Sequence, residues 1–412
     1  MKTSHFFQNI ITNNASQGLQ FGSRWVFNIA LINVLDITSY ALFSFIYSIS
    51  NILLAVLPFG SPTYLINEVE DQEGGIKKLF DSFVISFILT GLLLLLYLLL
   101  DFFISDIKGW EYYGYGIALG FILSLNISLF SYYKGLGKFL IELKAYAVFF
   151  LFLIGFVAYL FFIPNARKDI SFVFILLIGI NSLVFLLTVF SSKRIVTAFK
   201  SISVRRGVRR ISNAFTERTY FGLQEMTTAF YAQSGMLLLF YLLDTATYGY
   251  YRALFVVIAP LLLITVSFSQ VMLNYIKNLK STLFILTFRK IQGYSLAVGF
   301  MFVFAFYMLK DFLFGIIKVP INDNTTLAFG IVLGAILIRF MFTNYEMILV
   351  VLGKQKQRFY VVLCVAFINI GLIFTLLPKY GLIGAVSTNL LTYFVLLIGL
   401  LFSAESYLKK NL

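Results

Sequence analysis

Residues 34–40 read VLDITSY and residues 242–248 read LLDTATY, at an offset of 208 positions. In each copy an Asp is followed four residues later by a Tyr, at Asp36 and Tyr40 and again at Asp244 and Tyr248. Both copies stand between two long apolar stretches. A segment that recurs in an equivalent place indicates an internal duplication of the chain.

Two further pairs of segments recur in the same order. Residues 135–138 (GLGK) match residues 351–354 (VLGK) at an offset of 216, and Pro164 matches Pro378 at an offset of 214. Because the order is kept and the offset is nearly constant, we predict two related halves of six helices each. Six is even, so both halves would have the same orientation, as parallel repeats related by a pseudo-two-fold axis along the membrane normal.

The composition excludes a water-soluble protein. Of the 412 residues, 60% are hydrophobic and only 12% are charged, against about 45–50% apolar and about 25% charged in soluble domains. A membrane-spanning helix needs about 20 mostly apolar residues. We therefore predict an all-α polytopic membrane protein with about twelve transmembrane helices. The expected spans are 9–32, 39–62, 82–104, 113–134, 145–163, 171–192, 219–242, 247–275, 292–315, 326–352, 358–377 and 382–403.

The basic residues predict how the chain is oriented and divided. With a cytoplasmic N-terminus, 23 of the 32 Lys and Arg residues fall in cytoplasmic segments, as the positive-inside rule requires. Both termini are then cytoplasmic in a bacterial inner membrane. The expected parts are an N-terminal bundle (1–192), a basic cytoplasmic linker (193–218) and a C-terminal bundle (219–412). The net charge of +14 follows from this topology and from anionic lipid, so no nucleic acid partner is expected.

Several kinds of chemistry are absent from the sequence. The single Cys (Cys364) and the single His (His5) exclude an intrachain disulfide, a Cys-rich metal site and most His-based catalysis. No GxxxxGK[ST] phosphate loop occurs, so no ATP site is expected. We predict no metal, no cofactor and no enzymatic activity; a membrane polymerase or acyltransferase is the enzymatic alternative.

Charged residues inside the expected spans are the candidate site residues, because a charge near the bilayer centre costs about 2.5–3.5 kcal/mol. Arg24 carries Gln17, Gln20 and Asn28 beside it at helical spacing, so helix 1 presents a polar stripe that would form one wall of a cavity. A guanidinium matches phosphate with two parallel hydrogen bonds. We therefore predict a phosphate-binding cavity, with Arg252 and Arg339 as its further cationic residues.

Two carboxylates complete this set. Glu346 lies seven residues after Arg339, so the two would lie on one helix face; they neutralise each other or a neighbour, or they belong to the cavity. Glu225 is either the partner of a buried Arg or a site for a coupling ion, H+ or Na+.

The sequence resembles a known family in three places. These are the two Asp-to-Tyr segments, the Leu352-Gly353-Lys354 turn, and the run from Tyr380 to Ala385 that enters the last helix. They are similar to the polysaccharide-flippase branch of the multidrug/oligosaccharidyl-lipid/polysaccharide exporter superfamily, and the resemblance covers the whole chain in the number and order of spans. Where that family has Gly after the loop aromatic, this chain has Gly249 in the second copy but Ala41 in the first.

The resemblance implies a function. Flippases of that branch move a polyprenyl-diphosphate-linked oligosaccharide, the repeat unit of O-antigen or capsule, across the cytoplasmic membrane. They typically have a cationic cavity, which Arg24 and Arg252 would match in this chain. The expected partners are that lipid-linked oligosaccharide, membrane lipid and a polymerase of the same glycan pathway. A drug/cation antiporter of the same superfamily is the alternative, and a lipid II flippase differs only in its substrate.

Overall fold

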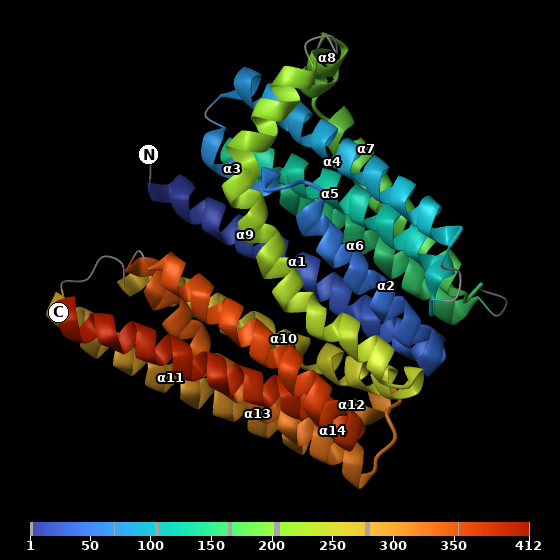
Figure 1. Cartoon of the computed structure of the whole chain (residues 1–412). Helices are drawn as coiled ribbons and strands as arrows, with labels where there is room; N and C mark the ends of the chain where they lie inside the picture. The colour runs from blue at the N-terminus through green and yellow to red at the C-terminus, as the bar shows by residue number, and fades with distance from the viewer. Residues whose placement is uncertain are drawn as a thin grey trace. The chain divides into compact units, whose positions relative to one another are not determined.

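The computed structural model describes residues 3–69, 71–103, 107–163, 167–201, 207–276, 281–352 and 354–411, and over these residues it is all-helical (Figure 1). This confirms the predicted fold class. The helices are α1 (Thr3–Val34), α2 (Ile37–Val56), α3 (Ser61–Glu68), α4 (Gln72–Asp101), α5 (Tyr113–Gly135), α6 (Phe139–Phe162), α7 (Ile170–Phe190), α8 (Lys193–Ser201), α9 (Gly207–Leu242), α10 (Thr245–Ile276), α11 (Ser281–Met308), α12 (Lys310–Ile317), α13 (Asp323–Val351) and α14 (Gln355–Asn411), with a 3-10 turn at Trp110–Tyr112.

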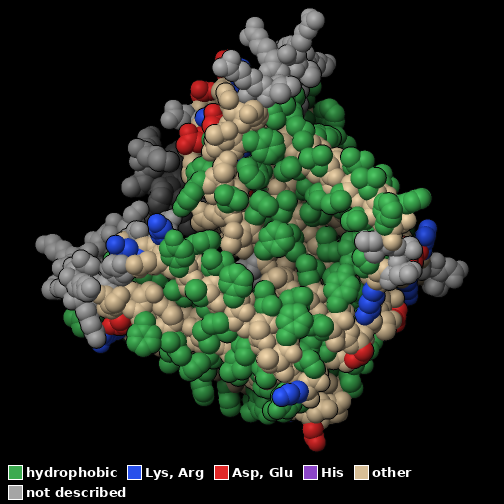
Figure 2. All heavy atoms as spheres, viewed as in Figure 1, with side chains coloured by type: hydrophobic (Ala, Val, Ile, Leu, Met, Phe, Trp, Pro, Cys, Tyr) green, Lys and Arg blue, Asp and Glu red, His purple; other side chains and the backbone are tan. Residues whose placement is uncertain are grey.

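Eight helices of the described part are long and apolar enough to cross a membrane. The longest, α14, contains the last two expected spans, which meet at Gly381, where the backbone leaves the helical region (φ 51°, ψ −122°). The other expected spans lie in α1, α9 and α10. Large apolar side chains are exposed along α4 and α6, among them Leu98 and Leu151, and hydrophobic side chains cover much of the face shown in Figure 2. The chain is a multi-pass membrane protein.

The chain forms two compact units. The first contains residues 1–35 and 42–237, and the second contains residues 36–41 and 238–412. Within the expected linker, residues 193–201 form α8 and α9 begins at Gly207. Most of α9 therefore belongs to the first unit.

Each unit has a central helix. In the first unit α5 packs against α3, α4, α6 and α7, and in the second unit α13 packs against α10, α11 and α14. Close approach depends on a small residue in the first unit, where a Cβ added to Gly120 would lie 2.7 Å from the Cβ of Leu53. Small residues at such contacts let helices pack tightly in a membrane, where helix association relies on van der Waals contact.

The two Asp-to-Tyr segments have the same local structure. The Asp36 carboxylate accepts hydrogen bonds from the backbone N–H groups of Thr38 (3.1 Å) and Ser39 (3.0 Å), and the Asp244 carboxylate accepts one from the N–H of Thr247 (2.9 Å). Each Asp thus caps the helix that follows it, α2 or α10. The two Tyr side chains are fully buried, with 0% exposure at both positions.

The two copies of this segment also contact each other within the second unit. A Cβ added to Gly249 would lie 2.7 Å from the carbonyl oxygen of Ile37, so only Gly fits at this point of the second copy. In the first copy the equivalent position is filled by Ala41, which is fully buried.

The Gly-Lys turns of the two halves also match. After α5 the N–H of Lys138 donates to the carbonyl oxygen of Tyr133, and after α13 the N–H of Lys354 donates to that of Leu349, both at 2.8 Å. This bond, which reaches five residues back, closes the end of each helix. Pro164 and Gly353, from the same sets of repeated residues, lie outside the described residues.

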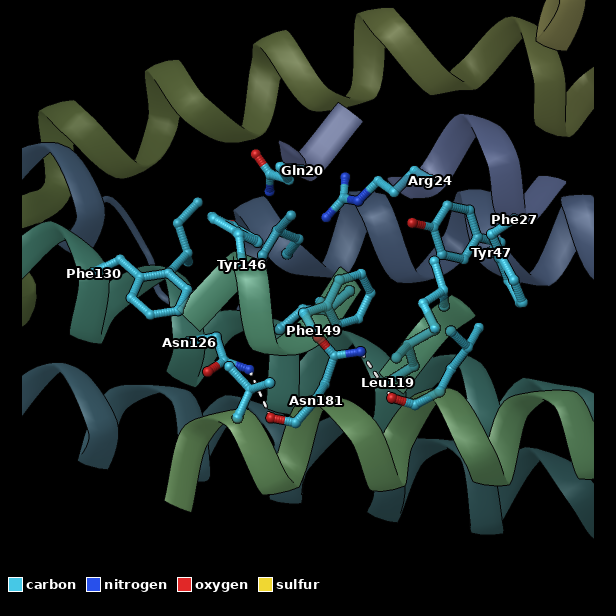
Figure 3. Close-up of a pocket in the computed structure, with 16 residues that line it drawn as sticks. Gln20, Arg24, Phe27, Tyr47, Leu119, Asn126, Phe130, Tyr146, Phe149 and Asn181 are labelled. Carbon is cyan, nitrogen blue, oxygen red and sulfur yellow. Dashed lines mark hydrogen bonds between the residues drawn. The ribbon is translucent and has the colours of Figure 1, made fainter. Parts of the chain in front are cut away.

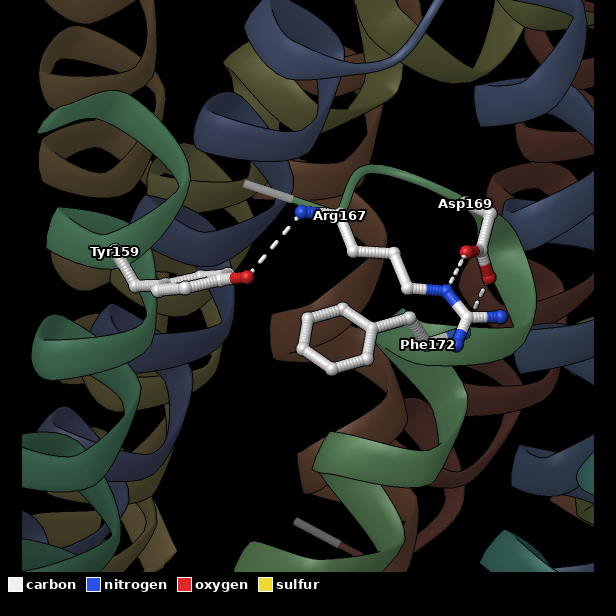
Figure 4. A network of polar contacts seen from close by, with 4 residues as sticks. All are labelled: Tyr159, Arg167, Asp169 and Phe172. Atoms are coloured by element: carbon white, nitrogen blue, oxygen red, sulfur yellow. Dashed lines mark hydrogen bonds and ion pairs between the residues drawn. The ribbon is translucent and has the colours of Figure 1, made fainter. Parts of the chain in front are cut away.

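The connection between α6 and α7 is held by another acidic cap (Figure 4). The Asp169 carboxylate accepts a hydrogen bond from the N–H of Phe172 (2.7 Å) and pairs with the guanidinium of Arg167. The backbone N–H of Arg167 donates to the hydroxyl oxygen of Tyr159 (3.2 Å). One short segment therefore fixes the beginning of α7 and ties it to the end of α6.

The turn between α2 and α3 has a left-handed backbone and lies against α9. Phe59 (φ 44°) and Gly60 (φ 72°) both have positive φ, and a Cβ on Gly60 would lie 2.4 Å from the backbone nitrogen of Gly222. The backbones of the turn and of α9 thus touch.

We predict that Gly60→Ala lowers the free energy of unfolding by about 2–5 kcal/mol, and Gly137→Ala by only about 1–2 kcal/mol. Both glycines have φ near 70° (72° and 71°), so the cost of the backbone conformation is the same. Only at Gly60 would the added Cβ clash with another backbone, that of α9, since nothing lies within 4 Å of the Cβ position of Gly137. Unfolding of the purified variants in detergent measures this, and equal losses would contradict the contact.

A second prediction concerns the cap of α2, which lies between the spans. Burial raises the pKa of Asp36, but hydrogen bonds from Ser39 and Thr38 outweigh it and lower that pKa from 3.8 to about 2. The native pKa is below the unfolded one, so this stabilisation is complete above about pH 5 and is lost as the pH falls toward 2. In Asp36→Asn the unfolding midpoint should change less over this range than in the wild type. An identical pH dependence would show that the cap contributes nothing.

Candidate functional site

A pocket in the first unit contains Arg24. It is lined by sixteen residues from α1, α2, α5, α6 and α7, and encloses about 690 Å³ of empty space, including space that opens to the outside. Figure 3 shows Arg24 and Gln20 of α1 on one side of the pocket, with Asn126 of α5 and Asn181 of α7 across from them.

Arg24 is the one charged residue among the sixteen that line the pocket. The described residues give its half-buried guanidinium no ion pair. Glu142, one turn before Tyr146 on α6, is bound instead to Lys134 (2.8 Å). Among the described residues nothing compensates the positive charge of this pocket, which favours an anionic ligand.

Amide and aromatic groups form the rest of the polar lining. The side-chain NH2 of Asn126 donates to the backbone oxygen of Asn181 (3.0 Å), and that of Asn181 donates to the oxygen of Leu177 (2.8 Å). Asn126 is only 5% exposed. Tyr47 and Tyr146 face the same space. Sequence reasoning missed Asn126 and Asn181, although an isolated amide within an apolar span is a signal of its own.

The other residues of the predicted polar stripe do not line this pocket. Asn28 donates to the carbonyl oxygen of Arg24 on its own helix (2.7 Å), and Gln17 is half-buried on α1 outside the set of lining residues. Of the stripe, the pocket brings together Arg24 and Gln20.

Arg252 and Arg339 belong to the second unit. Arg252 is half-buried on α10. Arg339 on α13 donates from Nη1 to the hydroxyl oxygen of Tyr393 on α14 (3.3 Å), with its guanidinium carbon 5.9 Å from the centroid of that ring. Arg24 lies in the first unit.

Glu346 is neutralised by a residue other than Arg339. Its Oε1 accepts a hydrogen bond from Nε of Arg358 (3.0 Å), at the beginning of α14, and forms an ion pair with Nη2 of the same residue (2.9 Å). Of the alternatives that the sequence leaves open, neutralisation by a neighbour fits this geometry.

Glu225 lies on α9 against α3. The hydroxyl of Thr63 donates to its Oε1 at 2.5 Å, and the backbone N–H of Thr63 lies 3.4 Å from the same oxygen. No Arg is bound to Glu225 among the residues that the structure describes.

A polar cluster that the sequence did not reveal lies two turns earlier on α9. Arg218, expected in an exposed linker, is 1% exposed. It donates from Nη2 to the carbonyl oxygen of Lys78 (3.0 Å) and to the hydroxyl of Ser82 (3.3 Å), and it stacks on the ring of Tyr64 at 4.5 Å. The Tyr64 hydroxyl donates to Glu217 (2.6 Å). This cluster fixes α9 to α3 and α4. Within the described ranges, no three His, Cys, Asp or Glu residues come together as metal ligands.

The fold is shared with solved transporters, although no family model and no curated protein matches the sequence. A multidrug resistance MATE family transporter of the MOP superfamily, in an inward-facing conformation, superimposes with a TM-score of 0.70 at 13% identity and covers 96% of both chains. The lipid II flippase MurJ, in an inward closed conformation, gives 0.71 at 15% identity over 95% of this chain and 87% of its own.

A third similar structure is a MOP superfamily transporter from Pyrococcus furiosus, described as having a binding pocket of reverse polarity that suggests a different function. It gives a TM-score of 0.65 at 13% identity over 97% of this chain and 95% of its own. The chain therefore has the fold that these MOP superfamily transporters share.

The Glu346 pair generates a testable prediction. In a double-mutant cycle, Glu346→Gln and Arg358→Gln should show a coupling of about 1 kcal/mol in the free energy of unfolding. Glu346→Gln and Arg339→Gln should be additive to within about 0.5 kcal/mol, because the two side chains do not meet. A larger coupling in the second cycle would instead assign Glu346 to Arg339.

Proposed function

We propose that this protein is a flippase that moves a polyprenyl-diphosphate-linked oligosaccharide, such as an O-antigen or capsule repeat unit, across the bacterial cytoplasmic membrane. The observation that carries the proposal is the Arg24 guanidinium, which lines a pocket of the first unit and has no ion pair among the described residues. A diphosphate supplies the anionic oxygens that such a guanidinium binds with two parallel hydrogen bonds.

The rest of the pocket suits the group next to the diphosphate. Asn126, Asn181 and Gln20 offer amide groups, and Tyr47 and Tyr146 offer aromatic faces, which together suit the hydroxyls and the apolar faces of sugars. The polyprenyl tail would stay in lipid while the headgroup is enclosed. Alternating access of the two units would then release it at the outer surface, and Arg252 and Arg339 are the proposed cationic contributions of the second unit.

Similarity to known structures supports a transport function of this kind. One similar structure is a lipid II flippase, and the Pyrococcus protein, by its description, ties a different pocket polarity to a different function within the same fold. A polymerase that consumes the exported repeat unit is the proposed downstream partner.

A drug/cation antiporter is the second candidate, and the similarity to MATE transporters favours it. Cationic drugs need carboxylates or aromatic faces for recognition. The pocket has aromatic faces but no carboxylate, and its one charge is positive, so the charge of the pocket separates the two candidates in favour of the flippase.

Surface glycan in a strain that lacks the gene tests the proposal. Wild type should restore the glycan, and Arg24→Ala should reduce it by about tenfold to a hundredfold, the effect of losing hydrogen bonds to a charged group, with lipid-linked repeat units accumulating in the cytoplasmic leaflet. Arg24→Lys should restore part of the activity, because an ammonium keeps the charge but not the planar fork.

The matched control is Arg167→Ala, which removes an exposed Arg outside the pocket and should behave as the wild type does. Normal surface glycan without the gene, together with increased sensitivity to cationic drugs, would instead establish the antiporter.

A further inference from the structure

The side of the pocket that lies across from Arg24, here called its floor, contains two asparagines whose amide groups are fixed in orientation. Asn126 and Asn181 lie on α5 and α7, two of the helices that are long and apolar enough to cross a membrane. Nδ2 of Asn126 donates to the backbone oxygen of Asn181 (3.0 Å), and Nδ2 of Asn181 donates to that of Leu177 (2.8 Å) (Figure 3). Because only the nitrogen of an amide can donate to a carbonyl oxygen, Oδ1 is the free end of each amide.

The two Oδ1 atoms lack a hydrogen-bond donor among the residues that the structure describes. The side chains of Asn126 and Asn181 are 5% and 8% exposed, and Oδ1 of Asn126 is buried with no partner. A buried acceptor without a donor is costly inside a membrane span. The contact between α5 and α7 uses only the amide nitrogen of Asn126, so helix packing does not account for the two oxygens.

The rest of the lining gives the pocket a direction. Its other polar side chains are Gln20, Arg24, Tyr47 and Tyr146, and all remaining lining residues are apolar. Gln20 lies beside Arg24 on α1 (Figure 3), and Tyr146 interacts electrostatically with Arg24 and with Tyr47. The donors of the pocket thus gather around the guanidinium, and the floor offers acceptors. A bound molecule must turn acceptors toward Arg24 and donors toward the floor.

The charge of the pocket decides which donors fit the floor. An ammonium group would share the pocket with the Arg24 guanidinium, and like charges repel each other in a site of low dielectric constant. A carboxylate has no proton to donate, and once Arg24 has bound the diphosphate no second cation remains among the lining residues. Burying that carboxylate would therefore be costly. Hydroxyl groups and the N–H of an acetamido group donate without carrying a charge.

We propose that this floor selects the sugar next to the diphosphate. The sugar is uncharged, and its hydroxyl or acetamido N–H groups donate to Oδ1 of Asn126 and of Asn181. A uronic acid is rejected at this position of the glycan. This inference rests on the proposed flippase function, and it names the class of sugar that the Arg24 pocket accepts.

Binding of soluble headgroup probes to the purified wild type in detergent tests the selection, with isothermal titration calorimetry as the measurement. The probes are citronellyl diphosphate by itself and the same diphosphate linked to glucose or to glucuronic acid. The glucose probe should bind at least about tenfold more tightly than the glucuronic acid probe, because the second carries a buried anion without a cation. Equal affinities, or tighter binding of the glucuronic acid probe, would overturn the proposal.

Four further probes, in which one hydroxyl of the glucose is replaced by fluorine, assign the contacts to the asparagines. Fluorine keeps an acceptor but removes the donor. At least one of these probes should bind the wild type about threefold to tenfold more weakly than the glucose probe does, the effect of losing a hydrogen bond. In Asn126→Leu or in Asn181→Leu that difference should disappear, because the acceptor is gone.

The matched control is Asn369→Leu, which removes another amide of a membrane-spanning helix. Asn369 donates to the hydroxyl of Thr392 within α14 (2.7 Å), outside the pocket, so this variant should keep the wild-type differences between the probes. If Asn126 and Asn181 only hold helices together, their Leu variants will bind all probes more weakly by the same factor. That result would overturn the assignment, as would a wild type that binds all four fluorinated probes as tightly as the glucose probe.

Citronellyl diphosphate without a sugar separates this inference from the proposed function. If it binds the wild type but not Arg24→Ala, and glucose adds no affinity, the diphosphate site stands and the selection at the floor is wrong. If the glucose probe binds with the expected dependence on Asn126 and Asn181 while Arg24→Ala binds every probe as the wild type does, the floor is a sugar site and the role proposed for Arg24 is wrong. If no probe binds the wild type, both proposals are wrong.

Discussion

The hydrocarbon interior of a membrane offers no hydrogen bonds, so every polar group inside it must find its partner within the protein. The backbone meets this requirement by forming helices, and the helix ends meet it with side chains such as Asp36, Asp244 and Asp169. The polar side chains of the spans are subject to the same requirement. Asn126 and Asn181 bind backbone oxygens, and Arg339 binds a tyrosine hydroxyl. A charged side chain without an ion pair among the described residues is therefore informative, and Arg24 is the group on which the proposed function rests.

Much of the fold could be predicted because it follows from one-dimensional patterns. Hydropathy defines the helices, and the spacing of Asp and Tyr in residues 34–40 and 242–248 reflects a cap and a buried aromatic that recur with the same geometry. The extent of α9 could not be predicted in this way. Its first turns are as basic as a surface linker, and Arg218 is buried only because Tyr64, Lys78 and Ser82, far away in the sequence, supply a ring and two acceptors.

The candidate site was predictable in kind but incompletely in its members. Arg24 and Gln20 share one helix face, so helical spacing alone brings them to the same pocket. Asn126, Asn181 and Tyr146 come from three other helices. Their convergence depends on how α5, α6 and α7 pack against one another and on how α6 packs against α1. The partner of Glu346 could not be predicted for the same reason. Arg339 lies on the same helix face, but the residue that forms the ion pair with Glu346 is Arg358 of the next helix.

Residues Asp36–Ala41 belong to the second unit although the chain on both sides of them belongs to the first, and this has a consequence for how the protein folds and evolves. These six residues are encoded in the first half but pack with the second unit, where Ile37 meets Gly249. Neither half is therefore a self-sufficient module. A chain that begins after residue 41 would lack these six residues, which pack inside the second unit. A circularly permuted or split version of the protein would fold only if residues 36–41 could still reach the second unit. Two units that share segments of one chain in this way must evolve as one protein.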